Sequence, residues 1–200
     1  MTTEEGKTVV GVARASIEEF VRTGKTKRTA WRTGTLSEKR GVFVTLNLAA
    51  QLGETLRGCI GYPLPVKPLG EAVEEVAVLA ASQDPRFPPV RKEELDGIIV
   101  EVSVLTQPET LKVRKRTDLP SRVRVGTDGL IVSKAYTSGL LLPQVPVEYS
   151  WGPEEFLSQT CMKAGLTPDA WLDEDTEVQR FQAEIFAEES PGGRVVRRPL

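Results

Sequence analysis

The sequence contains no histidine and only two cysteines, Cys59 and Cys161. Without histidine, the chain cannot form a serine–histidine–aspartate or cysteine–histidine catalytic group from its own residues, nor an imidazole metal site. It also lacks the side chain that most often carries a proton at neutral pH. Any catalysis must therefore use cysteine, carboxylate, lysine, arginine, tyrosine or serine side chains. Two cysteines form at most one disulfide, and we expect both thiols to be free.

Other classes of protein are excluded by what is scarce. No stretch approaches the about 18 consecutive apolar residues of a membrane span, and the first residues have neither the basic nor the apolar region of a signal peptide. We therefore expect a cytoplasmic protein that does not contact membranes. The acidic residues lack metal-ligand spacing, so we expect no metal and no cofactor. The 26 lysines and arginines nearly balance the 28 acids, for a net charge of -2. No global field attracts nucleic acid, although local patches remain possible.

The composition is that of a folded globular chain, with 40% hydrophobic and 27% charged residues among 200. That length fits one large domain or two small interlocked lobes. No internal repeat or linker divides the sequence. We expect a single domain over residues 1–200, with a core from about residue 8 to 187 and a loosely held tail at 190–200.

Periodic patterns of apolar residues predict the elements. Apolar residues three and four apart predict helices at 8–21, from Pro68 to about residue 80, and from Pro153 to Gly165. Alternating or β-branched runs predict strands, and Asp128-Gly129 predicts a hairpin turn. The predicted strands cover residues 41–46, 56–61, 98–105, 123–125, 130–132, 139–143 and 178–186, with a further strand-like stretch around Trp31.

The stretch Leu56–Gly61 has the strongest chemical pattern in the chain. In a regular strand, Arg57 and Cys59 point to the same face, which places a guanidinium beside a thiol. A neighbouring cation lowers the pKa of a cysteine from about 8.5 and produces the nucleophilic thiolate. Gly58 and Gly61 lack Cβ atoms and allow a ligand or another backbone to come close. The alternative for Cys59 is a small buried side chain in a crowded strand.

The strand at 98–105 supplies further polar candidates. Its valines and isoleucines face one way, and Glu101 and Ser103 face the other, where they need partners. Arg57 is one partner for Glu101, in a structural ion pair. The other interpretation is that Arg57 binds a ligand anion such as a phosphate through two hydrogen bonds. In the functional interpretation, Glu101 or Ser103 orients a group or moves a proton, and Gln144 adds an amide contact.

A basic segment, residues 112–124, contains six lysines and arginines against the single Asp118. One interpretation is that this segment contacts nucleic acid or an acidic partner. The other is that it is a solvated connection whose positive charge is balanced by the acidic stretch 173–177. No aromatic residues are interleaved with its cations, which weakens the nucleic-acid interpretation. Cys161 lies on the apolar stripe of a predicted helix and is expected in the core.

Six stretches, read together and in this order, resemble the AMMECR-type domain family, named for a human chromosomal region. They span most of the chain, which makes the resemblance more specific than one short motif. In one place the sequence differs, because Asn47–Thr55 is longer than the tight turn of many relatives. The six stretches are Gly41–Leu46, Leu56–Gly61, Asp84–Phe87, Glu101–Leu105, Gly139–Val145 and Lys163–Leu166.

The resemblance implies an α+β protein of two unequal lobes, each an antiparallel β-sheet with flanking helices, intertwined into one compact unit. It implies that the segment with Arg57 and Cys59 lies near the cleft between the lobes. Prokaryotic relatives are encoded beside, or fused to, radical-SAM and Memo-type proteins, so such proteins are the expected partners. The fold has been compared with nucleotide-binding, nucleic-acid-binding and peptide-binding domains. The resemblance implies no settled reaction.

Three functional hypotheses remain open from the sequence. The first is an enzyme or enzyme subunit for group transfer, with Cys59 as nucleophile, Arg57 and Gly58 at the ligand, and Glu101, Ser103 and Gln144 around it. The second is a non-catalytic module that binds nucleotide, nucleic acid or peptide for a partner enzyme; it predicts an inert Cys59 and salt-dependent binding through the basic segment. The third is a protein scaffold without a small-molecule site.

Overall fold

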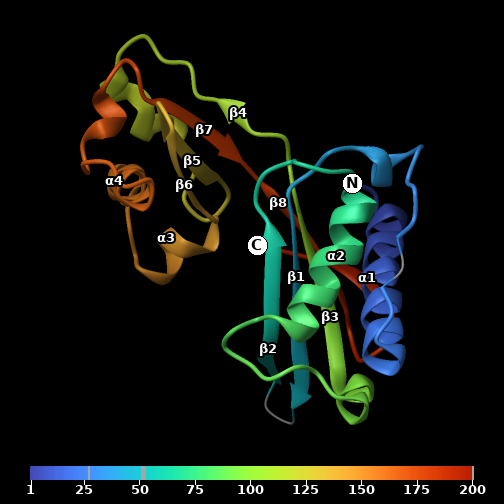
Figure 1. Ribbon diagram of the computed structural model, residues 1–200. Coiled ribbons are helices and arrows are strands. Elements are labelled where there is room, and N and C mark those ends of the chain that lie inside the picture. The colour runs from blue at the N-terminus through green and yellow to red at the C-terminus, as the bar shows by residue number, and fades with distance from the viewer. Residues whose placement is uncertain (27, 51–52, 200) are drawn as a thin grey trace. The chain divides into compact units, whose positions relative to one another are not determined.

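The computed structural model describes residues 1–26, 28–50 and 53–199, and the chain forms two compact units (Figure 1). Unit one comprises Met1–Leu105 and Glu184–Pro199, and unit two comprises Thr106–Ala183. Unit two is therefore an insertion in the sequence of unit one. Each unit contains a β-sheet, antiparallel in the strand pairs described, with helices beside it, which confirms the predicted α+β class.

The sheet of unit one has five strands in the order β2-β1-β3-β8-β9. Strand β1 pairs antiparallel with both β2 and β3. The observed bounds are β1 Val42–Ala50, β2 Gly53–Tyr62, β3 Ile98–Leu105, β8 Ala183–Glu188 and β9 Val195–Arg198. The turn inside the long stretch Asn47–Thr55 includes residues 51 and 52, which lie outside the described residues.

Two long helices cover one face of this sheet, α1 (Thr3–Thr23) and α2 (Leu69–Ser82). Helix α1 begins earlier than its apolar stripe because Thr2 and Glu5 form a reciprocal capping box. Two 3₁₀ helices, η1 (Thr35–Ser37) and η2 (Lys92–Gly97), complete this layer. The core between helices and sheet is built from apolar residues of these elements, including Val9, Ile17, Val44, Leu46, Val73, Val76, Val100 and Val102, each essentially inaccessible to solvent.

Unit two has a four-stranded sheet in the order β4-β7-β5-β6. Its strands are β4 Glu109–Thr110, β5 Gly129–Lys134, β6 Thr137–Leu141 and β7 Glu177–Phe181. Its helices are η3 Arg116–Arg122, α3 Gln144–Glu148, α4 Pro153–Lys163 and η4 Ala170–Leu172. Cys161 is fully buried among the core side chains of this unit, as predicted, and both cysteines are free thiols. Other members of that core are Leu119, Leu130, Val132, Phe156, Leu157 and Val178.

Three predicted elements are wrong. Residues 178–186 do not form one strand, because β7 ends at Phe181 in the sheet of unit two and β8 begins at Ala183 in the sheet of unit one. Residues 123–125 form no strand. The chain turns there instead, and the amides of Thr127 and Asp128 both donate to the carbonyl of Arg124. The stretch around Trp31 is irregular.

The C-terminal residues also differ from the expectation. The sequence predicts a loosely held tail at 190–200, whereas Val195–Arg198 form β9 and pair with β8. Arg198 in addition binds Glu54 with a nitrogen–oxygen distance of 2.5 Å and Glu101 at 3.3 Å. These ion pairs attach the end of the chain to β2 and β3. Within the described part of the chain, no helix is long and apolar enough to cross a membrane.

Candidate functional site

A β-bulge in β2 determines where the Arg57 side chain goes. In the register with β1, Leu46 opposes Gly58 and Asn47 opposes Leu56, so Arg57 has no partner of its own. The extra residue interrupts the alternation of side chains, and Arg57 and Gly58 are both buried beside the helices. Cys59 follows on the opposite face. The prediction that Arg57 and Cys59 share a face is therefore wrong.

Arg57 forms a buried ion pair with Glu94 of η2. Its Nε lies 2.7 Å from Oε1 and its Nη2 lies 3.2 Å from Oε2, and only 7% of Arg57 is exposed. The guanidinium carbon also lies 5.9 Å from the ring centroid of Phe87. Hydrogen bonding to Arg57 lowers the pKa of Glu94 from 4.5 to about 2. Arg57 thus has the predicted structural ion pair, but with Glu94 and not with Glu101.

Gly58 allows a close backbone approach between β2 and α2. A Cβ atom at this position would lie 2.3 Å from the carbonyl oxygen of Ala80. Of the two roles predicted for this glycine, contact with another backbone is the one that the structure explains.

The outer edge of β2 at Cys59 is covered by the turn that follows α2. The amide of Cys59 donates to Oδ2 of Asp84 at 2.8 Å, and its carbonyl accepts from Arg86 at 3.4 Å. Asp84 is 4% exposed and also accepts from the Arg86 amide and guanidinium. These bonds, with Arg86 first, hold the pKa of Asp84 well below its usual range. Two of the resembling stretches, Leu56–Gly61 and Asp84–Phe87, are therefore bonded to each other.

The thiol of Cys59 is half-buried, and no arginine among the described residues is directly bonded to it. The hydroxyl of Thr45 donates to its Sγ at 3.2 Å. Burial raises the pKa of the thiol above its ordinary value, against a smaller lowering by Thr45 and by the charge of Arg86. The expected lowering by Arg57 is therefore wrong, because the thiol is shielded from water and Arg57 is bound to Glu94 on the other face.

Glu101 and Ser103 do lie on the face that carries Cys59. Thr45 on the middle strand β1 opposes Cys59 on one side and Glu101 on the other, and Phe43 opposes Ser103. Burial raises the pKa of Glu101, although Arg198 lies 3.3 Å away. The structure therefore places Cys59, Glu101 and Ser103 on one face of the sheet, on the two strands that flank β1, and separates Arg57 from them.

Gln144 is the first residue of α3 and is exposed in unit two. No sequence pattern indicated that Thr45, Asp84, Glu94 and Arg198 are the contacts of the candidate residues. Asp84 stood in a resembling stretch, but its role depends on a contact 25 positions away. No local pattern signals such a contact.

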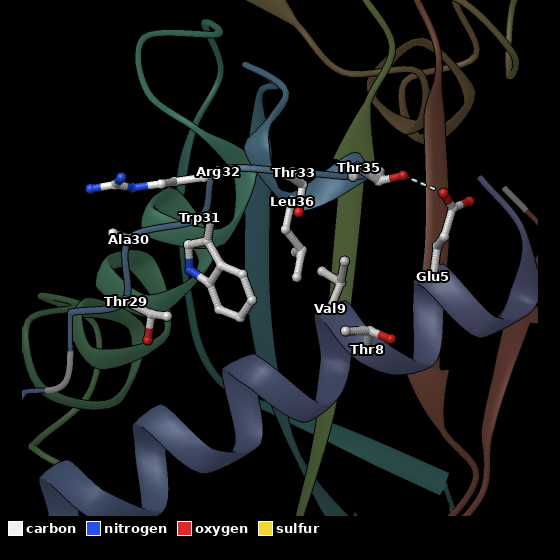
Figure 2. Close-up of a pocket in the computed structure, with 11 residues that line it drawn as sticks. Glu5, Thr8, Val9, Thr29, Ala30, Trp31, Arg32, Thr33, Thr35 and Leu36 are labelled. Atoms are coloured by element: carbon white, nitrogen blue, oxygen red, sulfur yellow. Dashed lines mark hydrogen bonds between the residues drawn. The ribbon is translucent and has the colours of Figure 1, made fainter.

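A separate pocket of about 560 Å³ lies between the first half of α1 and residues 29–36 (Figure 2). Trp31 and Leu36 point from that segment toward the helix, and the hydroxyl of Thr35 donates to Glu5. The indole of Trp31 rests on Gly70, and its Nε1 is buried without a hydrogen-bond partner among the described residues. None of the predicted site residues lines this pocket.

In unit two, the basic segment borders two adjoining hollows that share Arg122. One, of about 460 Å³, is lined by Arg114, Asp118 and Ser121 as well as Arg122 and Val113. The other, of about 550 Å³, is lined by Glu109, Thr110, Leu111, Lys112, Arg122 and Arg180. No aromatic side chain lines either hollow.

Most cations of the basic segment have no internal partner. Arg116 donates to the carbonyls of Trp171 and Thr176, which is a structural role. The acidic stretch 173–177 does not neutralise the segment, because Asp173 and Asp175 pair with Lys134. Arg124 lies 3.5 Å from Asp128. Within the described ranges, Arg116 and four exposed cations of the segment form no ion pair, and the four exposed ones are Lys112, Arg114, Lys115 and Arg122.

Comparison with known proteins agrees with the resemblance. A protein of Thermococcus onnurineus is 56% identical, with 98% of this chain and 97% of that protein covered. Protein PH0010 of Pyrococcus horikoshii is 54% identical, with 98% and 96% covered. The crystal structure of the uncharacterized protein PH0010 matches with a TM-score of 0.82 and 53% identity, over 100% of this chain and 99% of that one. The family model AMMECR1 matches residues 10–186, and the chain therefore belongs to the AMMECR1 family.

Proposed function

We propose that this protein is a binding module for nucleic acid, which it holds by its phosphates through the basic segment and presents to a partner enzyme. The observation that carries the proposal is the set of four exposed cations without ion pairs, three of which, Lys112, Arg114 and Arg122, line two adjoining hollows. Exposed arginines and lysines free of internal partners are available to neutralise phosphates. The radical-SAM and Memo-type proteins implied by the family resemblance are the proposed partners.

The arrangement favours a polymer of phosphates over a single anion. The cations spread from Lys112 to Arg122 along two hollows, and a phosphodiester chain carries one charge per nucleotide. Because no aromatic side chain lines the hollows, bases have no stacking surface there. We therefore expect binding that depends on salt and hardly on sequence.

An enzyme that uses Cys59 for group transfer is the second candidate. The observation in its favour is that Glu101 and Ser103 lie on the same face as the thiol, where burial raises the pKa of the Glu101 carboxyl. This candidate stands second because burial raises the pKa of the Cys59 thiol and because Arg57 is bound to Glu94.

The decisive experiment measures binding of a fluorescent 20-nucleotide single-stranded RNA by anisotropy over a range of salt concentrations. The variant Lys112→Gln/Arg114→Gln/Arg122→Gln should weaken binding and reduce the slope of log affinity against log salt by about 2, since each phosphate contact contributes about 0.7 on a single strand. A control variant with the same change of charge is Lys25→Gln/Arg32→Gln/Lys92→Gln, in unit one.

The control should bind as the unmodified protein does. An equal loss of RNA affinity in both variants would contradict the proposal, because the basic segment would then not be the site of binding. An affinity that does not respond to salt would also contradict it, because binding would then not depend on the charge of the phosphates. A DNA strand of the same sequence separates recognition of phosphates from recognition of the 2′-hydroxyl.

A further inference from the structure

A stacked aromatic pair, with one exposed ring, lies between α3 and α4 in unit two. The rings of Tyr149 and Trp151 are stacked, with centroids 4.8 Å apart and an interplanar angle of 16°. Trp151 packs on its inner side against the core of the unit. Tyr149 is 65% exposed, so one face of its ring is covered by Trp151 and the other faces solvent.

The backbone between the two rings adopts a conformation that a serine rarely takes. Ser150 has a φ of 56°, in the left-handed region, where glycine is normally found after a helix. The amide of Trp151 donates to the carbonyl of Pro146 at 2.8 Å, which closes the end of α3 and places residue 151 under residue 149. Strained backbone of this kind persists where surrounding contacts hold it, and it is concentrated at functional sites.

Carboxylates accompany the aromatic pair. Glu148 precedes Tyr149, and Glu154 and Glu155 follow Trp151 in the first turn of α4. All three are exposed, and none forms an ion pair with a described residue. The sequence from 144 to 162 contains no lysine or arginine.

The neighbouring turn adds an apolar border to the pair. Val147 is 57% exposed and lies beside Gly126, where a Cβ atom would be 3.2 Å from its Cγ2. Arg124, the cation on that turn, lies 3.5 Å from Asp128. We call the set Val147, Glu148, Tyr149, Trp151, Glu154 and Glu155 the Tyr149 patch.

We propose that the Tyr149 patch docks an arginine-bearing segment of a partner protein. A guanidinium can lie on the free face of the Tyr149 ring, where the ring quadrupole attracts it, while the three carboxylates supply charge complementarity. An anionic partner would meet like charge at this surface. The patch is independent of the basic segment, which attracts the opposite charge, and this inference goes beyond the nucleic-acid proposal.

The test uses the full-length protein and a fluorescein-labelled peptide of alternating arginine and glycine, followed by anisotropy. A second peptide carries citrulline, a neutral isostere, in place of arginine. We expect Tyr149→Ala to weaken binding of the arginine peptide by about fivefold, the loss typical of one exposed cation–π contact. Tyr149→Phe should retain binding, because the phenylalanine ring keeps the same quadrupole.

Tyr136→Ala is the matched control, since Tyr136 is fully exposed in the same unit but belongs to the turn between β5 and β6. It should bind as the unmodified protein does. The variant Glu148→Gln/Glu154→Gln/Glu155→Gln should also weaken binding and flatten its salt dependence. Circular dichroism of each variant establishes that it is folded before its affinity is compared.

Three results would overturn the proposal. The first is equal affinity of Tyr149→Ala and the unmodified protein for the arginine peptide. The second is equal affinity of the arginine and citrulline peptides for the unmodified protein. The third is a concentration-dependent dimer that Tyr149→Ala abolishes, since the patch would then belong to a second copy of this chain.

Discussion

Two regions of this molecule are rich in charged side chains, which are paired within the protein in one region and largely unpaired in the other. Around β2, Arg57 is bound by Glu94, Asp84 by Arg86, and Arg198 by Glu54 and Glu101. In the basic segment of unit two, four exposed cations remain without ion pairs within the described ranges. The first region has the residues that local chemistry marks as reactive, but its charges are used to hold strands and turns together. The second region consists mainly of lysines and arginines, whose charges are available to a ligand.

The comparison teaches that a charge in a strand is a poor guide to function when its burial is unknown. A buried guanidinium must be neutralised by the protein itself, because an unpaired buried charge is too costly. An exposed guanidinium has no such need. The following predictions test this difference, in order of decreasing effect.

Arg57→Ala should destabilise the fold by about 3 kcal/mol, because it leaves Glu94 in a mostly buried position without its partner. Arg122→Ala, which removes an exposed and unpaired cation, should change the free energy of unfolding by less than about 0.5 kcal/mol. Urea denaturation measures both. The comparison between the regions fails if the two variants lose similar stability.

The ion pair between Arg57 and Glu94 should also make the free energy of unfolding depend on pH. The pKa of Glu94 is about 2 in the fold and 4.5 ordinarily, so its contribution is complete above pH 4.5 and is lost as the pH falls toward 2. Urea denaturation between pH 7 and pH 2.5 should show this decrease, and Glu94→Gln should make it shallower. Glu101→Gln is the control, because the pKa of Glu101 is raised, and this variant should retain the decrease.

The pH dependence of Cys59 alkylation tests whether the pKa of this thiol is raised. Because burial raises its pKa, the rate of reaction with iodoacetamide should rise with a midpoint above the free-thiol value of about 8.5. Mass spectrometry reads the product, with the buried Cys161 as internal control. Arg57→Lys should leave the midpoint unchanged, whereas Arg86→Gln should raise it, since Arg86 is the cation that the thiol senses. A midpoint well below 8.5 would restore Cys59 as a nucleophile.

Backbone strain is a smaller difference between the regions. The two described residues other than glycine with left-handed φ values, Ala135 and Ser150, both belong to unit two. Ser150→Gly should stabilise the fold by about 1 kcal/mol, because glycine adopts this conformation without a Cβ clash. Ser158→Gly, within α4, should have the opposite sign. Thermal unfolding measures both, and a loss of stability in Ser150→Gly would show that the serine is not strained.

Much of the fold could be predicted from the sequence. The strand predicted at Ile98–Leu105 has the observed bounds, and Glu101 and Ser103 face away from the core as the alternation requires. The helix at Leu69–Ser82 follows its apolar stripe and begins after Pro68. These predictions hold because side-chain periodicity is a property of a single element and needs no knowledge of its neighbours.

By itself, the sequence determined the family, through six stretches that resemble it, and with the family the α+β class that the resemblance implies. It also determined the free cysteines and the core position of Cys161, since these depend on composition and local periodicity. The tertiary structure alone decided which groups meet. Because of a one-residue bulge in β2, Arg57 binds Glu94. The turn after α2 places Asp84 where it accepts a hydrogen bond from the amide of Cys59. The strand predicted at 178–186 was likewise divided between two sheets. The physical reason is that burial and charge pairing depend on partners from distant parts of the chain, whereas the pattern of a single strand is the same whichever partners it finds.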